Sequence, residues 1–598
     1  MSRQVEGVGA VERWVTELDS AAATEDVEAI VSLFAVDSFW RDLVAFTWNI
    51  TTVEGHAGIA HMLRHTLAHT RPHAFEVDHD RPLPAARAGV EQGWIRFSTS
   101  AGSAVGLVRL VDGKAWTLLT ALRELDGHEE SLRERRPWGA DHGVHTERKS
   151  WSETIAQERL EMGRVRQPDV LVVGGSQGGL ALAARLRQLD VATIVVDSTD
   201  RPGDTWRNRY KSLCLHDPVW FDHLPYLPFP ENWPVYTPKD KLADWLDLYA
   251  SAMEINFWGG TTCTAASWDE ESGRWDVTLD RSGKTEIVRP ANLVLATGLN
   301  GRPRHPVFEG ADDFAGEQHH SSEHPGPESY RDKKVVIVGA NNSAHDIAAA
   351  LCESGADVTM IQRSSTLVIK AETSRERSFG TLYSESAVSA GITADTADLI
   401  QAATPYRLVP EMQIPMWDEI RAADQEFYDA LTKAGFALDF GEDGSGLTMK
   451  FLTRGGGYYI DVGASGLVAD GSIRLRSGRQ ISRLDRDGLV LDDGEHLDAD
   501  VIVYATGFSP AQDSLAHIVS PEIAARVGRI WGLGSGREGD PGPWVGELRN
   551  MWRPTAQDGL WVHGGNLQMS RSYSTYLALQ LKARLVGLPT PVYEPDHG

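Results

Sequence analysis

DVLVVGGSQGGLALAARL, at residues 169–186, is the stretch of sequence that decides the fold. It predicts a short buried strand, a glycine-rich turn and a helix, and a second apolar strand, ATIVVD, follows at residues 192–197. Glycine is needed where a strand turns sharply into a helix and where a pyrophosphate group approaches the backbone. The N-terminus of the helix then offers free N–H groups and the positive end of its dipole. The sequence therefore predicts a βαβ unit that binds a dinucleotide.

Two residues of this first unit bear on the prediction that it binds a dinucleotide. Asp197 stands 23 residues after Gly174, where a carboxylate can accept hydrogen bonds from ribose hydroxyls. Ser176 replaces the second glycine of the G-x-G-x-x-G pattern, and its hydroxyl can donate to a phosphate. A glycine-rich turn of another α/β fold is the alternative interpretation. The residues expected to bind the cofactor here are Gly174, Gly175, Ser176, Gln177, Gly178, Gly179, Asp197 and Ser198.

The architecture repeats in KVVIVGANNSAHDIA at residues 334–348, where the pattern is G-x-N-x-x-A. The motif tolerates alanine at its third position, and Asn341 at the second is a residue type that accepts left-handed backbone. The next strand ends in Arg363, 24 residues after Gly339. A guanidinium there suits the 2′-phosphate of NADPH, although a surface arginine at a strand end is the alternative. The expected cofactor contacts are Gly339, Asn341, Asn342, Ser343, Ala344, Arg363 and Ser364.

Two further buried strands end in the same tripeptide, Ala-Thr-Gly. They are LVLATG at residues 293–298 and VIVYATG at residues 501–507, and each is expected to bring the chain back across a nucleotide. The expected contacts are Ala296, Thr297, Gly298, Ala505, Thr506 and Gly507. The acid after the first glycine turn and the cation after the second assign FAD to the first unit and NADPH to the second.

Length, charge and cysteine content limit the function classes. The 598 residues are enough for about three or four structural units. A formal net charge of −26 argues against nucleic acid and anionic membrane as partners. No apolar run approaches the length of a membrane span and no signal peptide is recognisable, so a cytoplasmic protein is expected. The three cysteines form no C-x-x-C pair, so neither a redox-active disulfide nor a metal site is predicted.

The pattern of apolar and polar residues along the chain predicts a small N-terminal unit and a larger α/β part. Residues 1–125 are expected to form an α+β cone, with one helix at residues 11–22 and a second, capped by Thr24, at residues 25–34. Alternating strands follow at residues 93–98 and 104–110. The predicted domains are residues 1–125, a linker at 126–167, a first part of the FAD domain at 168–330, an NADPH domain at 331–499 with a helical insertion at about 374–432, and a second part of the FAD domain at 500–598.

From about residue 168 to the end, the order of these motifs resembles the flavin-containing monooxygenases, most closely the YUCCA-type branch of class B flavoprotein monooxygenases. The motifs run FAD fingerprint, GDTW at residues 203–206, Ala-Thr-Gly, FAGEQHH at 314–320, NADPH fingerprint and Ala-Thr-Gly. Phe314, Gly316 and His320 fit the family signature F-x-G-x-x-x-H-x-x-x-[YFW], while His324 takes the aromatic position. Pro325 matches the Baeyer–Villiger variant and Ser321 the heteroatom oxidisers. The resemblance implies an α/β fold with two Rossmann-like dinucleotide-binding domains.

The resemblance also implies site residues. His216, in the sequence CLHDP, is expected at the isoalloxazine face, and GGN at residues 564–566 matches the segment that returns to the flavin ring. His216 and His320 are the candidate catalytic residues, His320 more as a group that orders the linker near NADPH; either could be purely structural. The further flavin contacts implied are Gly203, Asp204, Thr205, Trp206, Arg207, His216, Asp217, Gly565 and Asn566.

The N-terminal unit, with SFWRD at residues 38–42 as its most distinctive stretch, resembles the NTF2/SnoaL-type cone. A packing or dimerising role is expected for it rather than a catalytic one, and a homodimer is one option for the whole chain.

The activity implied by the resemblance is oxygen insertion. NADPH reduces FAD, and a C4a-(hydro)peroxyflavin transfers one oxygen atom from O2 to a small organic substrate. N- or S-oxygenation is the preferred prediction, with Baeyer–Villiger or oxidative-decarboxylating chemistry as the alternative. Three alternative hypotheses are an uncoupled NADPH oxidase, a two-dinucleotide reductase and a non-enzymatic flavoprotein sensor. The partners implied are the substrate and O2, with no nucleic acid or membrane.

Overall fold

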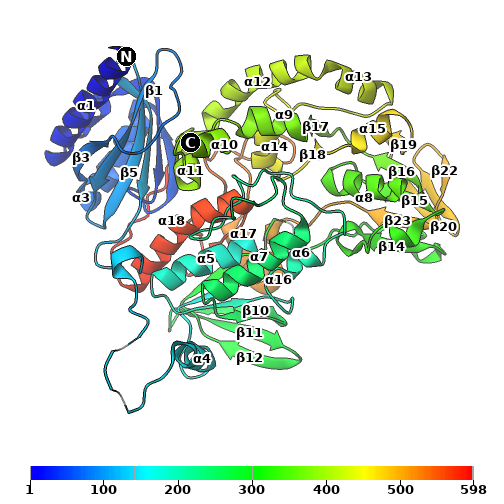
Figure 1. The fold of residues 1–598 in the computed structure, drawn as a ribbon, viewed down its shortest axis with the longest axis horizontal. Helices are drawn as coiled ribbons and strands as arrows, with labels where there is room; N and C mark the ends of the chain where they lie inside the picture. Colours follow the sequence, from blue (N-terminus) through cyan, green and yellow to red (C-terminus); the bar gives the residue numbers. More distant parts are fainter. Residues whose placement is uncertain (1, 141, 145, 300, 596–598) are drawn as a thin grey trace.

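The computed structural model describes residues 2–140, 142–144, 146–299 and 301–595. Two open parallel sheets lie next to each other, and a separate N-terminal unit packs beside the first of them and the C-terminal helix (Figure 1). The predicted α/β class is confirmed. Within the described residues no helix has the length and apolar content needed to cross a membrane.

The N-terminal unit is one curved sheet covered by helices. Its strands run in the order β2-β1-β6-β5-β4-β3, and β1 is parallel to β6 whereas the other neighbours are antiparallel. Helix α1 packs on β3 and β4, and α3 packs on β1. The elements are α1 (Ser2–Ala23), α2 (Val27–Ser32), β1 (Phe34–Leu43), β2 (Ile50–Glu54), α3 (Gly55–Thr70), β3 (His73–Asp78), β4 (Glu91–Ser98), β5 (Ser103–Val111) and β6 (Lys114–Leu122).

The prediction for the second helix of this unit was wrong in its start. Asp26, not Thr24, is the N-cap of α2, and its carboxylate accepts a hydrogen bond from the N–H of Ala29 at 2.9 Å. The Thr24 hydroxyl instead donates back to the carbonyls of Ser20 and Ala21 at the end of α1. Because the carboxylate is the stronger cap, α2 begins at Val27.

The first parallel sheet has the order β24-β13-β7-β8-β9. Alternate strand residues face opposite layers, as the twofold period of a strand requires. Val170 and Val172 pack with the helices α5, α7 and α18, whereas Leu171 and Val173 pack with the small antiparallel sheet β10-β11-β12. The elements are β7 (Val170–Val173), α5 (Gln177–Gln188), β8 (Thr193–Val196), α6 (Asp204–Arg207), α7 (Lys239–Ala252), β9 (Phe257–Trp258), β10 (Thr261–Asp269), β11 (Arg274–Arg281), β12 (Lys284–Val288), β13 (Asn292–Leu295), β24 (Leu560–Val562) and α18 (Leu567–Leu585).

The second parallel sheet, β14-β23-β15-β16-β19, repeats this layering. Val335 and Ile337 pack with α8, and Val336 packs with the antiparallel sheet β20-β21-β22. Strands β14 and β23 lie in this sheet, although the predicted domain limits at 330 and 500 place them with the FAD domain. The elements are β14 (Glu317–His320), β15 (Lys334–Val338), α8 (Asn342–Glu353), β16 (Asp357–Gln362), β19 (Arg474–Ser477), β20 (Ile481–Asp485), β21 (Gly488–Leu491), β22 (His496–Asp498) and β23 (Val501–Tyr504).

Helices separate the second sheet's strands β16 and β19 in the chain, in the region where the insertion is predicted. They lie above both sheets in the view of Figure 1. The strands β17 and β18 pair in parallel beneath them. The elements are β17 (Leu367–Lys370), α9 (Ala371–Ser374), α10 (Glu385–Ser389), α11 (Ala394–Ala402), α12 (Val409–Ala423), α13 (Gln425–Lys433), α14 (Leu447–Arg454), β18 (Tyr458–Asp461) and α15 (Ala464–Ala469).

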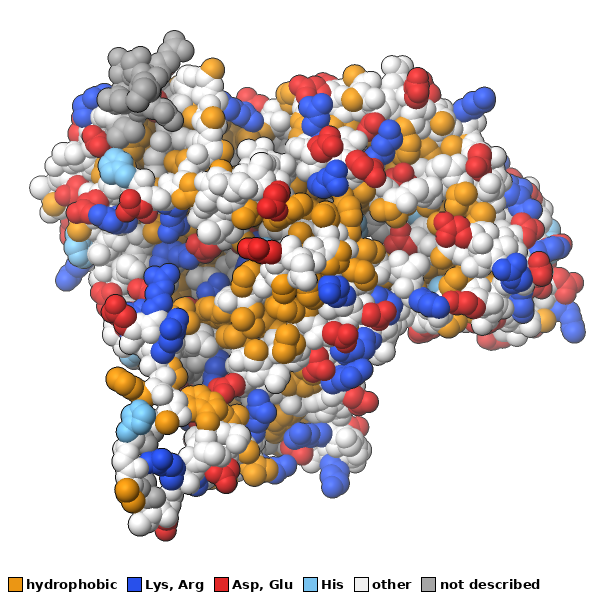
Figure 2. All heavy atoms as spheres, in the orientation of Figure 1, with side chains coloured by type: hydrophobic (Ala, Val, Ile, Leu, Met, Phe, Trp, Pro, Cys, Tyr) orange, Lys and Arg blue, Asp and Glu red, His pale blue; other side chains and the backbone are white. Residues whose placement is uncertain are grey.

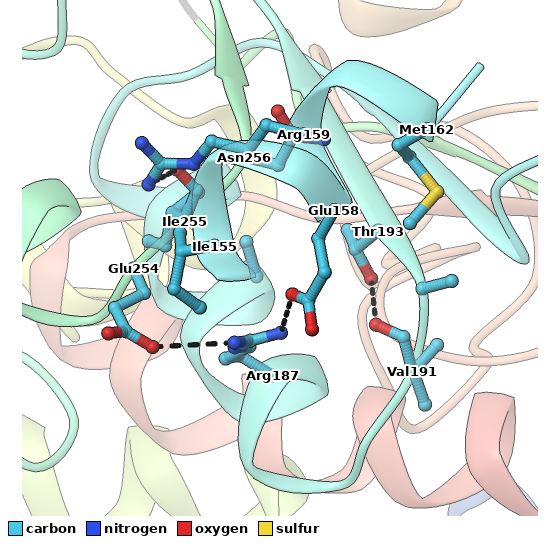
Figure 3. Close-up of a pocket in the computed structure, with 12 residues that line it drawn as sticks. Ile155, Glu158, Arg159, Met162, Arg187, Val191, Thr193, Glu254, Ile255 and Asn256 are labelled. Carbon is cyan, nitrogen blue, oxygen red and sulfur yellow. Dashed lines mark hydrogen bonds and ion pairs between the residues drawn. The ribbon is translucent and has the colours of Figure 1, made fainter. Parts of the chain in front are cut away.

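The predicted linker contains a helix, α4 (Trp151–Glu161). Ser150 and Glu153 form a capping box at its start, and this S-x-x-E spacing is a signal that the sequence offered. Arg187 of α5 lies between Glu158 of α4 and Glu254 and fixes α4 to the first dinucleotide unit (Figure 3). The cavity beneath α4 measures about 50 Å³, which is room for one or two water molecules and not for a cofactor.

Candidate functional site

The first glycine turn is closed by backbone on two sides. Gly174 has φ +108°, and a β-carbon there would lie 2.4 Å from the carbonyl oxygen of Ala296. A β-carbon on Gly179 would lie 1.9 Å from the carbonyl oxygen of Gly174. The turn between β7 and α5 therefore admits no side chain at either position, and the first Ala-Thr-Gly segment, at the end of β13, lies directly against it.

The segment at residues 203–207 reaches the same turn. The Ser176 hydroxyl donates to Oε1 of Gln177 at 2.6 Å, and the indole N–H of Trp206 donates to the same oxygen at 3.2 Å. Gly203 has φ +86°, and a β-carbon on it would lie 2.2 Å from the carbonyl oxygen of Ala243. The structure thus brings the predicted GDTW segment and the predicted glycine turn together, with Ser176 as the N-cap residue of α5.

Asp197, at the end of β8, closes the turn from the other side. Its Oδ2 accepts from the N–H of Gly175 at 2.6 Å, and its Oδ1 accepts from the N–H and hydroxyl of Thr199 at 2.8 Å. A carboxylate offers about four acceptor positions, so capacity remains for a ribose hydroxyl. The predicted acid is present at the predicted place, and it also stabilises the loop that holds it.

The C-terminal Gly-Gly-Asn segment arrives at this edge as well. A β-carbon on Gly564 would lie 3.7 Å from Cα of Gly298, and Gly565 has φ +105°. Asn566 caps α18 by accepting from the N–H of Met569 at 2.9 Å, so its side chain serves the helix. The helices α5 and α18 therefore begin at the same edge of the first sheet.

Two residues near this edge escaped the sequence analysis. His563, at the end of β24, is buried beside Gly178, and burial lowers the pKa of its imidazole to about 4, so the ring is neutral. The hydroxyl of Ser570, on α18, is buried and makes no hydrogen bond with the described residues. The position of His563 directly before Gly-Gly-Asn is the signal that points to it; nothing in the sequence marks Ser570.

The second glycine turn is built in the same way. Gly339 has φ +131°, and a β-carbon on it would lie 2.4 Å from the carbonyl oxygen of Ala505, in the second Ala-Thr-Gly segment. Asn341 does not use the left-handed backbone that its residue type tolerates, since its φ is −106°. It is the N-cap residue of α8, a position that takes extended backbone. Asn342 accepts from the N–H of Ile460 at 3.0 Å, which ties α8 to β18.

Arg363 follows the last residue of β16, as predicted, and its side chain is exposed. No carboxylate of the described residues forms an ion pair with it. Ser364 beside it is exposed too. The guanidinium is therefore available to an anionic ligand at the carboxyl edge of the second sheet, where a dinucleotide binds in this type of fold.

Replacing Arg363 with alanine is expected to weaken NADPH binding by about ten- to a hundredfold, because a charge-assisted hydrogen bond contributes about 1.5–3 kcal/mol. Binding of NADH, which lacks the 2′-phosphate, should change little. Isothermal titration of both nucleotides measures this. The matched control is Arg479→Ala, since Arg479 is an exposed arginine of the same unit that pairs with Asp493. Equal losses for NADPH and NADH would remove the 2′-phosphate role.

His216 lies where the cores of the two units meet. Tyr210 packs in the core of the second unit, whereas Leu215 and Val219 pack in that of the first. The His216 ring meets the ring of Tyr458 edge-on, with 6.4 Å between centroids. The chain segment 210–219 therefore crosses from one dinucleotide unit to the other, and His216 sits at the crossing.

His320 is fully buried and both ring nitrogens are engaged. Its Nδ1 accepts from the N–H of Ser322 at 3.1 Å, so its Nε2 carries the proton and donates to the carbonyl of Gly507 at 2.9 Å. It thereby links the end of β14 to the second Ala-Thr-Gly segment. This geometry agrees with an ordering role and leaves no free nitrogen for chemistry.

His324 takes the place of the signature aromatic and behaves as one. Its ring stacks with His319 at 5.3 Å and 25°, and with Tyr330 at 5.6 Å and 20°. It is 4% exposed, and burial, aided by His319, lowers its pKa to about 4. The ring is thus neutral and buried, so the departure from the signature keeps a flat ring at this position.

A buried charge network that acts on Asp217 was also missed. Arg571, on α18, binds Asp398 of α11 through Nε at 2.9 Å and Nη2 at 2.7 Å, and its Nη1 donates to the carbonyls of Phe221 and His223. Asp222, between those carbonyls, is fully buried and neither carboxyl oxygen has a hydrogen-bond partner among the described residues. Burial, and then Asp217, raise the pKa of Asp222 well above its usual value. No local sequence pattern marks these residues.

The residues present fit two dinucleotides. At each glycine turn a backbone carbonyl stands where a β-carbon would lie, and each turn lies at the carboxyl edge of a parallel sheet against an Ala-Thr-Gly segment. The first turn also has an unpaired buried hydroxyl, that of Ser570, beside it. The first unit offers an acid after its turn and the second an unpaired arginine. An acceptor for ribose hydroxyls suits FAD in the first unit, and a cationic donor for a 2′-phosphate suits NADPH in the second.

Comparison with known proteins supports this. Residues 197–385 match the family model described as flavin-binding monooxygenase-like. An indole-3-pyruvate monooxygenase of Oryza sativa subsp. japonica is 32% identical over 354 residues, which are 59% of this chain and 79% of the relative. The chain belongs to the flavin-binding monooxygenase-like family. A probable indole-3-pyruvate monooxygenase of Arabidopsis thaliana is 30% identical, over 57% of this chain and 81% of that protein.

Solved structures of flavin monooxygenases share the fold. Cyclohexanone monooxygenase bound to ε-caprolactone, in its loose conformation, is 18% identical with a TM-score of 0.52, over 71% of this chain and 90% of that one. The complex of OTEMO with FAD and NADP is 19% identical with a TM-score of 0.50, over 71% and 85%. Membership of the flavin-binding monooxygenase-like family confirms the predicted enzyme class, a flavin-dependent monooxygenase, and with it the predicted flavin.

Proposed function

We propose that this monooxygenase binds FAD at the turn of residues 174–179 and NADPH at the turn of residues 339–344, and oxidises a small organic amine at nitrogen. The observation that carries the proposal is the position of His216 on the segment that joins the two units. Both glycine turns lie close to this part of the chain, since Trp206, four residues before the segment, contacts the first turn and Tyr210 packs in the core that contains α8. A group there can act on chemistry that needs both cofactors.

The bound cofactors supply hydride transfer and oxygen activation. The chain supplies placement and proton control. His216 would stand beside a bound flavin, and Asp217, next to it, is a carboxyl whose pKa is raised by burial and lowered by His216. His320 keeps β14 in register with the second Ala-Thr-Gly segment. Hydrophobic side chains gather near the centre of the face shown in Figure 2.

The preference for an amine rests on the acids beside His216. Asp217 lies close enough to Asp222 to raise the pKa of Asp222, and Arg571, which opposes this rise, already binds Asp398 through two nitrogens. An excess of carboxyl groups favours a cationic ligand and disfavours an anionic one. A carboxylate there can also take the proton of an ammonium group, which leaves the nitrogen lone pair free for oxidation.

Oxidation of a 2-oxo acid is the second candidate. Its support is that the plant relatives described above are named indole-3-pyruvate monooxygenases. Pro325 after the signature matches the Baeyer–Villiger variant, and carbonyl chemistry would need the same two cofactors.

We also propose a role for residues 1–125 and limits for the NADPH domain. Residues 1–125 fit an NTF2/SnoaL-like packing domain, because its inner face is filled by aromatic rings such as Trp40 and Phe97. The sheet memberships of β14 and β23 favour limits for the NADPH domain near residues 316 and 508.

Turnover with matched substrates tests the proposed function. We expect an N,N-dimethylated arylethylamine to give N-oxide in near equimolar amount to the NADPH consumed, and an arylpyruvate to give none. In His216→Gln the product per NADPH should fall by about tenfold and hydrogen peroxide should rise, because proton control by one group contributes at least that factor. The control is His496→Gln, an exposed histidine paired with Asp485. Product from the arylpyruvate alone would favour the second candidate, and peroxide alone from both substrates would reject both candidate substrate classes.

A further inference from the structure

Arg209, the residue before the crossing segment, is a partly buried cation with no carboxylate partner among the described residues. Its Nε is buried and makes no hydrogen bond with them. Burial lowers the pKa of this guanidinium. In Arg571 burial acts in the same direction, but Asp398 outweighs it and the pKa is raised. Because a charge held out of water costs free energy unless it is paired, Arg209 lacks a counter-charge that an anionic ligand can supply.

The guanidinium of Arg209 lies at the second Ala-Thr-Gly segment, on the side of the NADPH unit. Its Cζ is 5.3 Å from the ring centroid of Phe508, the residue directly after that segment. The next residue along the chain, Tyr210, donates from its phenol to Oδ2 of Asp346 on α8 at 2.8 Å. The second glycine turn contacts the same Ala-Thr-Gly segment and leads into α8. Arg209 is therefore held by the two elements that flank this turn.

A second arginine lies at the same edge of the second sheet. The backbone N–H of Arg304 donates to the carbonyl of Gly507 at 3.0 Å, and its carbonyl accepts from the hydroxyl of Thr506 at 2.6 Å. The side chain of Arg304 is exposed, and no carboxylate of the described residues forms an ion pair with it. The acid of this region, Glu323, faces His305 at 3.8 Å. This edge thus carries two unpaired guanidiniums in a chain whose formal net charge is −26.

We propose that Arg209, with Arg304 as a second cation, binds the pyrophosphate of NADPH at the second glycine turn. The NADPH site belongs to the proposed function, and this inference rests on it. A guanidinium offers a fork of donors that matches phosphate oxygens, and the free N–H groups at the start of α8 suit the remaining oxygens. Because Arg209 comes from the FAD part of the chain, NADPH is then held by both units. A bound nucleotide thereby fixes the start of the crossing segment, which carries His216.

Two ligands that share the 2′-phosphate separate this contact from that of Arg363. In purified, FAD-loaded protein we expect Arg209→Gln to weaken NADP⁺ binding by about ten- to a hundredfold in isothermal titration. Binding of adenosine 2′-monophosphate, which has no pyrophosphate, should change by less than about twofold. Arg363→Ala should weaken both ligands. Arg209→Lys, which keeps the charge but not the fork, should restore part of the affinity for NADP⁺.

Arg109→Gln is the matched control for loss of a partly buried arginine. Arg109 also has no carboxylate partner among the described residues, and it donates to the carbonyl of Ala403 at 2.8 Å. Its variant should leave NADP⁺ binding unchanged. Wild-type affinity for NADP⁺ in Arg209→Gln, or equal losses for both ligands, would overturn the inference. Loss of flavin from Arg209→Gln, with circular dichroism unchanged, would assign the guanidinium to FAD and overturn it too.

Arg304→Ala tests the same site without a change in the core. It should weaken NADP⁺ binding by about two- to fivefold at low salt, as expected for an exposed charge pair, and leave the flavin content unchanged. If Arg209→Gln does not fold, wild-type NADP⁺ affinity in both Arg209→Lys and Arg304→Ala would overturn the inference.

Gly339→Ala separates failure of this inference from failure of the proposed NADPH site. A β-carbon there would lie 2.4 Å from the carbonyl oxygen of Ala505, so the variant distorts the turn itself. If Gly339→Ala weakens NADP⁺ binding and Arg209→Gln does not, the NADPH site stands and Arg209 is not part of it. If neither variant weakens binding, the proposed NADPH site is rejected together with the inference.

Discussion

Replacing Arg41 with methionine is expected to destabilise the folded chain by about 3–5 kcal/mol. Arg41, on β1 of the N-terminal unit, binds both carboxylate oxygens of Glu547, Nε to Oε1 and Nη2 to Oε2, each at 2.7 Å. Both side chains are 2% exposed. The variant leaves Glu547 as a buried carboxylate with its only described guanidinium partner removed, and that uncompensated charge accounts for most of the loss.

The structure around this pair explains why the loss should be large. Arg41 also donates to the carbonyl of Ala402 at 2.9 Å and to the hydroxyl of Tyr573 at 3.0 Å. One side chain therefore binds the N-terminal unit to α11 and to α18. Thr52 donates to the same carboxylate of Glu547 at 2.7 Å. Loss of the guanidinium therefore weakens the packing of the whole N-terminal unit against α11 and α18.

Urea unfolding followed by circular dichroism and by flavin release measures the effect. The double variant Arg41→Met/Glu547→Leu should recover most of the stability, because apolar groups replace both charges. Arg64→Met is the control in the same unit, since Arg64 and Glu28 form an exposed pair that contributes about 1 kcal/mol or less. If Arg41→Met and Arg64→Met lower the free energy of unfolding by the same amount, the buried pair does not hold the N-terminal unit in place.

Local physical requirements made much of the fold and part of the site predictable. The turns at Gly174 and Gly339 need residues without a β-carbon, and the residues around them show strand and helix periods, so both units could be placed from short stretches. The same local logic located Asp197 and Arg363 at strand ends. Ser150 and Glu153 show that a local signal can also be overlooked, since their capping box marks α4 inside the predicted linker.

Non-local contacts were beyond the sequence. Arg41 and Glu547 are 506 positions apart, and Tyr210 and Asp346 are 136 apart. Strand β23 pairs with β15, with Val501 opposite Val335, and nothing within β23 distinguishes that sheet from the first one. Such pairings depend on how complete units pack against each other. Local patterns in a single sequence, such as hydrophobic periodicity or a helix cap, do not report this packing. The ring of His324 is a case of the same kind, because only its stacking shows that it replaces the signature aromatic.

Replacing Gly179 with alanine is expected to lower the flavin content of the purified protein by more than about tenfold. The new methyl group would lie 1.9 Å from the carbonyl oxygen of Gly174, and a backbone atom cannot yield as a flexible side chain does. Overpacking of this kind costs about 1–3 kcal/mol or more, and about 1.4 kcal/mol is a factor of ten in binding. The strain falls on the turn itself, where α5 directs its N–H groups toward the expected pyrophosphate.

Flavin absorbance relative to protein absorbance, together with titration of FAD into the apoprotein, measures the loss. Gly456→Ala is the matched control, since a β-carbon there meets no atom within 4 Å and should leave the flavin content unchanged. Circular dichroism should show the same secondary structure for both variants, which separates loss of the cofactor from loss of the fold. Full flavin content in Gly179→Ala would mean that the pyrophosphate is held elsewhere, and the order of the two cofactors along the chain would have to be assigned again. Loss of flavin with retained NADP⁺ binding would instead place the two dinucleotides on separate turns, because Gly339 and α8 do not share backbone with the strained segment.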